Sequence, residues 1–136
     1  MSKAFHDTTV NEAKTRGEID TLLRKHSVEA FRWTEMPHGM VLEFKHPDGS
    51  FAIGADFAVG DAKRPEQRRR QVLRALHWHI KAKFDAIDFG LEDMAKAFLP
   101  YMITAPNRTL YDDVQDAQEQ RTLGIDVPLL PERITQ

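Results

Sequence analysis

A basic amphipathic stretch from Lys63 to Lys83 constrains this chain more than any other feature of its sequence. It contains eight lysines and arginines but only one acidic residue, Glu66, so its local charge is +7 in a chain whose net charge is −2. The rest of the chain therefore carries a charge of −9. Any fold of this chain must place one strongly cationic element on an otherwise acidic molecule.

The apolar residues of this stretch recur with the helical period of about 100° per residue, and the pattern continues past Lys83. They are Val72, Leu73, Leu76, Ile80, Phe84 and Ile87. The spacing predicts one long helix that ends near Asp88. Pro65 suits its first turn, because a nitrogen at that position has no intrahelical hydrogen bond to lose. Asp61 is the expected N-cap.

A row of basic side chains follows one flank of the apolar face at helical spacing. Arg70, Arg74, His77 and Lys81 form this row, and Trp78 lies beyond it and points away from the core. Such cations suit a phosphate backbone, and an exposed aromatic ring suits a stacked base. The pattern predicts a nucleic-acid surface made of Arg64, Arg68, Arg70, Arg74, Trp78 and Lys81. A merely solvated charged face is the alternative interpretation.

Length and composition limit the class of protein. A chain of 136 residues with 41% hydrophobic residues suits one globular domain. It has no cysteine, which excludes disulfides and thiolate metal sites. No apolar run approaches the roughly 18 residues of a membrane span, and no signal sequence is evident. We therefore expect a soluble, cytoplasmic protein that does not interact with membranes. The pI of 6.3 confines any nucleic-acid binding to one face.

The N-terminal half predicts one helix followed by strands. Thr15 and Glu18 have the spacing of a capping box, so the first helix is expected from Thr15 to about Lys25, with His26 as its terminator. The hydrophobic pattern then alternates, which favours strands at 31–33, 40–44 and 51–57, joined by turns at 37–39 and 46–49. Three successive strands of this kind predict an antiparallel meander.

After the long helix, the sequence predicts a short helix from Leu91 to Leu99 that Pro100 stops, an extended piece at 101–104 and a turn at 105–107. A last helix is expected over 110–120, with a buried stripe of Leu110, Tyr111, Val114 and Ala117. The fold class is therefore α+β, a three-stranded meander packed on the long basic helix with additional C-terminal helices. We expect a flexible leader at 1–14, one domain at 15–121 and an irregular tail at 122–136.

No catalytic motif is present, since the chain lacks a P-loop, a Rossmann glycine pattern, a nucleophile elbow and a zinc-protease motif. His77 and His79 lie about 200° apart on a helix and cannot chelate one ion together. An acidic row at the C-terminal end could bind a divalent ion, although such rows are usually solvated. It consists of Asp112, Asp113, Asp116 and Glu119. The prediction is a non-enzymatic protein without a metal or another cofactor.

The block from Arg70 to Met102 resembles the central block of a family of small uncharacterised proteins encoded by bacteriophages and prophages. That family carries an Arg-Gln-x-Trp-Arg-Ala-Leu helix, then Ile-Lys-Ala-Lys and later Phe-Leu. Residues 8–26 are similar to the family's opening block. Leu73 replaces the family's tryptophan, and Asn107 stands where the family often has Asp-Gly before Arg-Thr. The resemblance implies a phage or prophage accessory protein, and it does not imply any catalytic activity.

The predicted order α-β-β-β-α also resembles that of double-stranded-RNA-binding domains, in which the start of the second helix holds lysines against phosphates. Arg64, Arg68 and Arg69 would occupy that place, but the family's glycine-rich loop and lysine spacing are absent. The core of phage proteins that anneal single strands, which also places a basic helix on a small sheet, is a second analogy, but this chain is short for such a core. Fold order alone does not assign a function.

Two functions from different classes remain open. The first is a module that binds nucleic acid through the basic helix. The second is a protein-interaction module, such as an inhibitor or adaptor aimed at a host complex, that uses the basic helix or the acidic C-terminal helix. The expected partner is therefore nucleic acid or a host protein.

Overall fold

The computed structural model describes residues 11–57 and 64–120, and the structural statements below concern these residues alone. The elements are the helices α1 (Glu12–Lys25), α2 (Pro65–Asp88), α3 (Met94–Ala97) and α4 (Leu110–Glu119), the 3-10 helix η2 (Leu99–Tyr101), and the strands β1 (Ala30–Met36), β2 (Gly39–His46), β3 (Gly49–Asp56), β4 (Ile103–Ala105) and β5 (Arg108–Thr109). The α+β prediction is confirmed. Most of the predicted leader, at 1–10, and the predicted tail at 122–136 lie outside the described residues.

The strands β1, β2 and β3 form an antiparallel sheet in that order, which confirms the predicted meander. In its register Leu42 of β2 lies opposite Trp33 of β1 and Ile53 of β3. Successive side chains of a strand point to opposite faces, so these three share one face. Leu42 and Ile53 are buried, which identifies this face as the side of the core.

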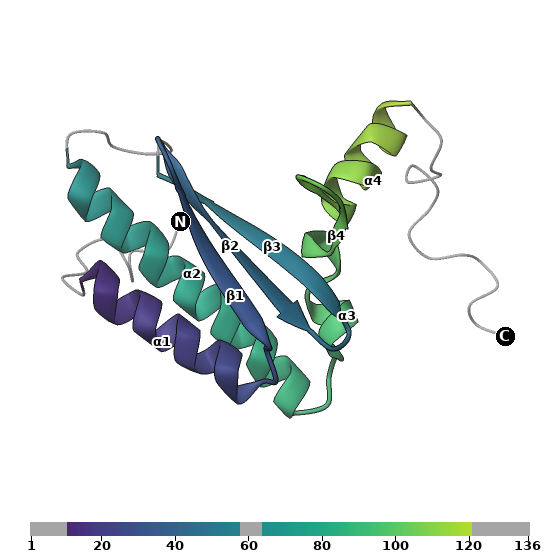
Figure 1. Cartoon of the computed structure of the whole chain (residues 1–136), viewed down its shortest axis with the longest axis horizontal. Helices are drawn as coiled ribbons and strands as arrows, with labels where there is room; N and C mark the ends of the chain where they lie inside the picture. Colours follow the sequence, from purple (N-terminus) through teal and green to yellow (C-terminus); the bar gives the residue numbers. More distant parts are fainter. Residues whose placement is uncertain (1–10, 58–63, 121–136) are drawn as a thin grey trace, which may run out of the picture.

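The helices α1 and α2 lie side by side along the core face of the sheet (Figure 1). They run in the same direction, because Glu12 contacts Arg69 near their starts and His26 contacts Asp88 near their ends. The sequence predicted α2 as the cover of the sheet, and α1 shares that role. The buried core consists of Ile19, Leu23, Met40, Leu42, Phe44, Phe51, Ile53, Leu73, Leu76, Ile80, Phe84, Met94, Ala97 and Phe98.

The first helix begins earlier than the capping-box pattern predicted. Asn11 is its N-cap and accepts a hydrogen bond from the backbone N–H of Lys14 at 2.8 Å. Thr15 is therefore a buried residue inside the helix, and the predicted leader is too long by several residues. The local spacing of Thr15 and Glu18 was misleading because Glu18 pairs with α2 instead. The predicted end at Lys25 is confirmed.

Two residues with positive φ end the long helices. Ser27, at φ 66°, follows α1, and the N–H of Val28 donates to the carbonyl of Leu23 at 3.2 Å. Gly90, at φ 75°, follows α2, and the N–H of Leu91 donates to the carbonyl of Ala86 at 2.9 Å. Both ends therefore have the Schellman arrangement, in which a left-handed residue lets the chain satisfy helix-end carbonyls.

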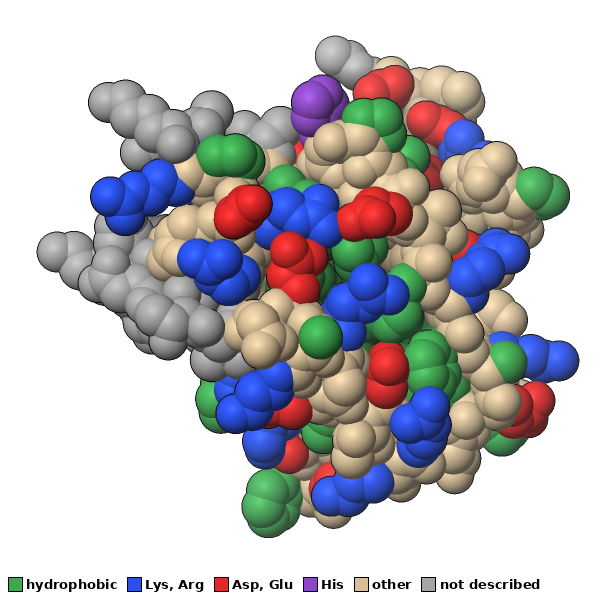
Figure 2. Space-filling model, turned by 60° about the vertical axis from the view of Figure 1, so that its left-hand side comes forward, with side chains coloured by type: hydrophobic (Ala, Val, Ile, Leu, Met, Phe, Trp, Pro, Cys, Tyr) green, Lys and Arg blue, Asp and Glu red, His purple; other side chains and the backbone are tan. Residues whose placement is uncertain are grey.

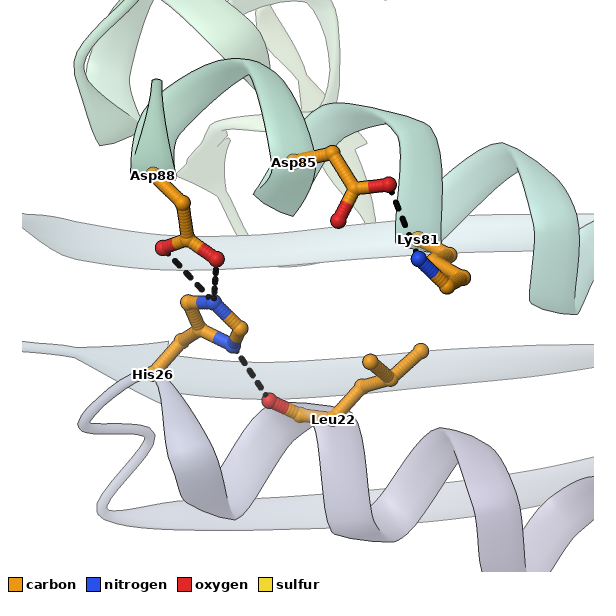
Figure 3. Close-up of polar contacts among 5 residues, drawn as sticks. All are labelled: Leu22, His26, Lys81, Asp85 and Asp88. Atoms are coloured by element: carbon orange, nitrogen blue, oxygen red, sulfur yellow. Dashed lines mark hydrogen bonds and ion pairs between the residues drawn. The ribbon is translucent and has the colours of Figure 1, made fainter. Parts of the chain in front are cut away.

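His26 joins the C-terminal ends of α1 and α2 (Figure 3). Its ring stacks on Phe84 with centroids 4.1 Å apart. Nδ1 lies 2.8 Å from the carbonyl oxygen of Leu22, and Nε2 lies 3.1 Å from each carboxylate oxygen of Asp88. The histidine that was expected only to terminate α1 thus also fixes the distance between the two helices.

The C-terminal elements depart most from the prediction. Pro100 lies inside η2 rather than after a continuous helix. Asn107, at φ 59°, makes the turn between β4 and β5, which confirms that turn. The helix α4 stands apart from α1 and α2 (Figure 1), and none of its residues is buried. The predicted buried stripe of α4 is therefore wrong, because its residues are at most half-buried and Tyr111 is 54% exposed.

None of the described helices is both long enough and apolar enough to cross a bilayer.

Candidate nucleic-acid interface

The first turn of α2 is the most open part of the predicted basic surface. Arg64 is the N-cap and makes no side-chain capping bond, and Pro65 occupies the first turn as predicted. The prediction that Asp61 caps the helix is wrong because Arg64 is the N-cap, and Asp61 itself lies outside the described residues. A hollow of about 350 Å³ lies beside this turn, lined by Arg64, Pro65, Glu66, Gln67 and Arg70.

Arg69 is turned toward the body of the molecule. Its guanidinium lies 2.9 Å from the carboxylate of Glu12 in α1 and 2.6 Å from that of Glu35 in β1. It also lies 4.6 Å from the ring centre of Phe57. The hydrogen bonds that Arg69 donates to the carboxylate of Glu12 contribute most to raising the pKa of Arg69 above its usual range. Arg69 is therefore a structural cation that ties α2 to α1 and β1.

Arg74, a predicted phosphate contact, also faces α1. Its guanidinium lies 2.9 Å from the carboxylate of Glu18 and 5.7 Å from the ring centre of Trp78. The hydrogen bond from Arg74 lowers the pKa of the Glu18 carboxyl below its ordinary value. The charge of Arg74, which the sequence offered to a phosphate, is therefore compensated by Glu18 within the fold.

His77 belongs to the predicted basic row, yet it is buried between α2 and α1. Its Nε2 lies 3.7 Å from the carboxylate of Glu18. Burial lowers the pKa of His77, because the charged imidazolium loses its hydration, and the nearby charge of Arg74 acts in the same direction. The ring is therefore held preferentially neutral, and it contributes little to the basic character of the row.

Lys81 is paired within its own helix, since its Nζ lies 2.9 Å from the carboxylate of Asp85 (Figure 3). Lys83 lies on the other flank of α2, where it donates to the carbonyl of Ala97 at 2.8 Å. His79 also faces that flank, with Nε2 3.2 Å from the hydroxyl of Tyr101. The basic helix is thus in contact with acceptors along both of its sides.

Three of the six predicted site residues form no ion pair with another described residue. Within the described part of the chain, Arg64, Arg68 and Arg70 form no ion pair, and Arg70 donates a hydrogen bond of 2.5 Å to the neutral side chain of Gln67. Trp78 is 45% exposed, as its position predicted. Among the residues that the structure describes, the arginines of the predicted site without an ion pair therefore lie at the N-terminal end of α2, whereas Arg74 and Lys81 are in ion pairs.

Acidic and basic side chains are interspersed over the side of the molecule that contains α1 and α2 (Figure 2). The acidic partners of α2 come from other elements, Glu12 and Glu18 from α1 and Glu35 from β1. Sequence reasoning missed all three, because they precede their arginines by between 34 and 57 residues. No local pattern in the sequence signals such a contact.

The acidic row of α4 is also used by the chain itself. Arg108 contacts the carboxylates of Asp113 and Asp116. The carboxylate of Asp112 accepts the N–H of Thr109 at 2.9 Å, as part of a capping box. Across the residues that the structure describes, no group of three or more histidines and carboxylates is arranged to hold a metal ion.

Neither a known protein family, nor a curated protein sequence, nor a solved structure matches this chain.

Proposed function

We propose that the protein binds nucleic acid through the N-terminal half of α2, with Arg64, Arg68 and Arg70 against phosphates. One observation carries the proposal: the uncapped first turn of a 24-residue helix opens beside arginines that form no ion pair within the described residues. The positive end of a helix dipole favours an anion there. The carboxylate of Glu66 in the same turn opposes this attraction in part.

Trp78 supplies a second contact farther along the helix. It follows Arg70 by about 12 Å of helix rise, at 1.5 Å per residue. Its ring is half exposed and flanked by the guanidinium of Arg74. Aromatic side chains in such positions stack on unpaired bases, and they do so with little preference for the nucleic-acid sequence. The surface therefore suits a single strand whose phosphates lie near Arg64 and Arg70 and whose base reaches Trp78.

The test is fluorescence anisotropy with labelled single-stranded DNA, duplex DNA and duplex RNA, repeated over several salt concentrations. The double variant Arg64→Glu with Arg70→Glu should weaken binding by roughly tenfold or more and flatten the salt dependence, because fewer counterions are released. The double variant Lys25→Glu with Lys96→Glu is the matched control, since it makes the same change of charge at exposed positions elsewhere. Equal affinity of both variants would contradict the proposal.

The variant Trp78→Ala separates the two parts of the surface. Loss of a stacking platform should weaken binding of a single strand by about 1–3 kcal/mol and leave duplex binding nearly unchanged. A protein partner is the second candidate for this surface, and the interspersed charges of Figure 2 favour it. Binding of lysate proteins that survives nuclease treatment and is lost in the Arg64→Glu, Arg70→Glu variant would support that candidate instead.

A further inference from the structure

Four side chains form one connected cluster where α1 and α2 lie side by side (Figure 1). The carboxylate of Glu18 faces two side chains of α2, with one oxygen 2.9 Å from the guanidinium of Arg74 and the other 3.7 Å from Nε2 of His77. The ring centre of Trp78 lies 5.7 Å from the guanidinium carbon of Arg74 and 5.1 Å from the ring centre of His77. The cluster therefore connects a buried histidine to a half-exposed aromatic ring.

Glu18 holds its two neighbours unequally. Its contact with Arg74 is a hydrogen bond, whereas the separation of 3.7 Å from His77 is too long for one. The side chain of Glu18 is 34% exposed, so its carboxylate has room to turn. A carboxylate that accepts from Arg74 at full strength therefore has a second nitrogen within reach.

The buried ring of His77 depends on this carboxylate for its charge. Nδ1 is buried and has no hydrogen-bond partner among the described residues. The described charged groups that act on the ring are Glu18 from α1 and Arg74 and Lys81 from α2 itself, and Lys14 acts in turn on Glu18. Glu18 is the one member of this group that favours the imidazolium. Protonation of His77 is therefore favoured most when Glu18 turns toward it.

We propose that a proton on His77 and a phosphate on Arg74 promote each other's binding, because Glu18 exchanges Arg74 for the imidazolium. The coupling rests on the nucleic-acid surface proposed above and adds regulation by pH to it. The proton comes from solvent and is held on the ring, which then donates to the carboxylate. Arg74 is released beside Trp78, where the phosphate of a stacked nucleotide can accept from it.

The two effects are equal by thermodynamic linkage. If the proton strengthens binding by some factor, the bound strand raises the pKa of His77 by the logarithm of that factor. The contribution of one partly exposed ion pair corresponds to a factor of about three. The gain appears as the pH falls below 6.5, the ordinary pKa of histidine, because burial lowers the pKa of His77. Glu18 stays ionised there, since Arg74 lowers its pKa from 4.5.

Fluorescence anisotropy with a labelled single-stranded oligonucleotide tests the coupling at about pH 8 and about pH 5.5, at one ionic strength. On acidification the parent chain should gain about threefold more affinity than His77→Gln gains. The control is His79→Gln, on the flank of α2 that contacts Tyr101, and it should keep the gain of the parent. Equal gains in the parent and in His77→Gln would overturn the coupling alone. Absence of binding at both pH values would overturn the nucleic-acid surface as well.

The variant Glu18→Gln separates the exchange of partners from a direct attraction between imidazolium and phosphate. Arg74 has no carboxylate to leave in this variant, so the further change His77→Gln should not alter the gain on acidification. If His77 supplied the same gain without Glu18, the exchange would be wrong.

The pKa of His77 in the parent chain gives a measurement that needs no variant. Ring chemical shifts followed over pH, with and without a saturating oligonucleotide, report the pKa of each histidine. The strand should raise the pKa of His77 more than that of His79, because only His77 faces Glu18. An equal rise at both rings, or no rise at His77, would contradict the coupling.

Discussion

The guanidinium of Arg74 lies 2.9 Å from the carboxylate of Glu18, although 56 residues separate them in the chain. This contact changes what α2 can offer to an anion. Arg74 stands between an acidic side chain of α1 and the exposed ring of Trp78. Any phosphate that approaches Trp78 must therefore compete with Glu18 for the same cation.

The variant Glu18→Gln should strengthen nucleic-acid binding. It removes the competing carboxylate and makes Arg74 available, which adds about one neutralised phosphate and steepens the salt slope by about 0.9 on a duplex. Anisotropy titrations at several salt concentrations measure both quantities. The control is Glu29→Gln, which removes an equal charge from an exposed position beside Lys45. An equal gain in both variants would indicate a general charge effect and not release of Arg74.

Stability should fall as the pH decreases, in two stages. Burial lowers the pKa of His77 from its ordinary value of 6.5, and Arg74 lowers that of Glu18 from 4.5. Both groups therefore bind protons more readily in the unfolded chain, so unfolding takes up protons and becomes easier in acid. The His77 contribution is lost as the pH falls below about 6.5, and the Glu18 contribution below about 4.5.

Urea unfolding at a series of pH values measures this dependence. His77→Leu should flatten the stage that begins near pH 6.5, and Glu18→Gln the stage below 4.5. The variant His79→Leu is informative as a comparison, because burial lowers the pKa of His79 as well, at a site that does not contact α1. An unchanged pH profile in both His77→Leu and Glu18→Gln would show that these groups do not control the acid sensitivity.

The meander and the long helix follow from local patterns, and so the sequence was sufficient to predict them. Alternating apolar residues fix which side of each strand is buried, and the period of α2 correctly marks Leu73, Ile80 and Phe84 as its inner side. Local patterns could not predict in the same way which cations of α2 form ion pairs. Whether Arg74 is free depends on α1, which is distant in the sequence and lies beside α2 only in the folded chain.

The two histidines near the turns should have opposite neutral tautomers. Nδ1 of His26 faces the carbonyl oxygen of Leu22, which can only accept, and we expect that nitrogen to keep its hydrogen in the neutral ring because the competing carboxylate of Asp88 is more than half exposed and can turn to water. Nδ1 of His46 accepts the backbone N–H of Asp48 at 3.0 Å, so its hydrogen must be on Nε2. Ring nitrogen chemical shifts, followed as the pH is raised until both rings are neutral, distinguish the tautomers. The same tautomer at both residues would contradict the geometry.

The bond from Nε2 of His26 to Asp88 requires a second hydrogen on the same ring, because an ionised carboxylate can only accept. This contact therefore belongs to the imidazolium form, whereas the bond to Leu22 persists in the neutral form. The variant Asp88→Asn should leave the stacking on Phe84 in place. Because the carboxylate is more than half exposed, the loss of stability should be under about 1 kcal/mol.

Ser27→Gly should stabilise the protein by about 0.5–1 kcal/mol. A left-handed backbone costs a residue with a Cβ roughly 1–2 kcal/mol, and glycine avoids this cost but loses part of the gain through the entropy of the unfolded chain. The reciprocal change at the end of α2, Gly90→Ala, should destabilise it by about 1 kcal/mol. Denaturant midpoints measure both. Ser27→Ala is the control, and a gain equal to that of glycine would contradict the role of the positive φ.

Two predictions about helices were wrong for the same reason: the start of α1 and the burial of α4 depend on contacts with other elements, which local sequence does not show. Thr15 has the spacing of a cap, but its side chain is buried under tertiary contacts and Asn11 takes that role. The apolar stripe of α4 has the period of a buried helix, yet none of its residues is buried. The periodicity of a sequence shows that one side of a helix is apolar, but it does not show which element packs against that side.

The distant acidic partners of α2 also have a consequence for how the chain folds. Arg64 and Arg68, and likewise Arg70 and Arg74, are four residues apart, and like charges at that spacing repel in an isolated helix. Glu12, Glu18 and Glu35 relieve the repulsion only from other elements. The helix is therefore weak by itself and gains its stability at the moment of docking, which links secondary and tertiary structure formation into one cooperative step.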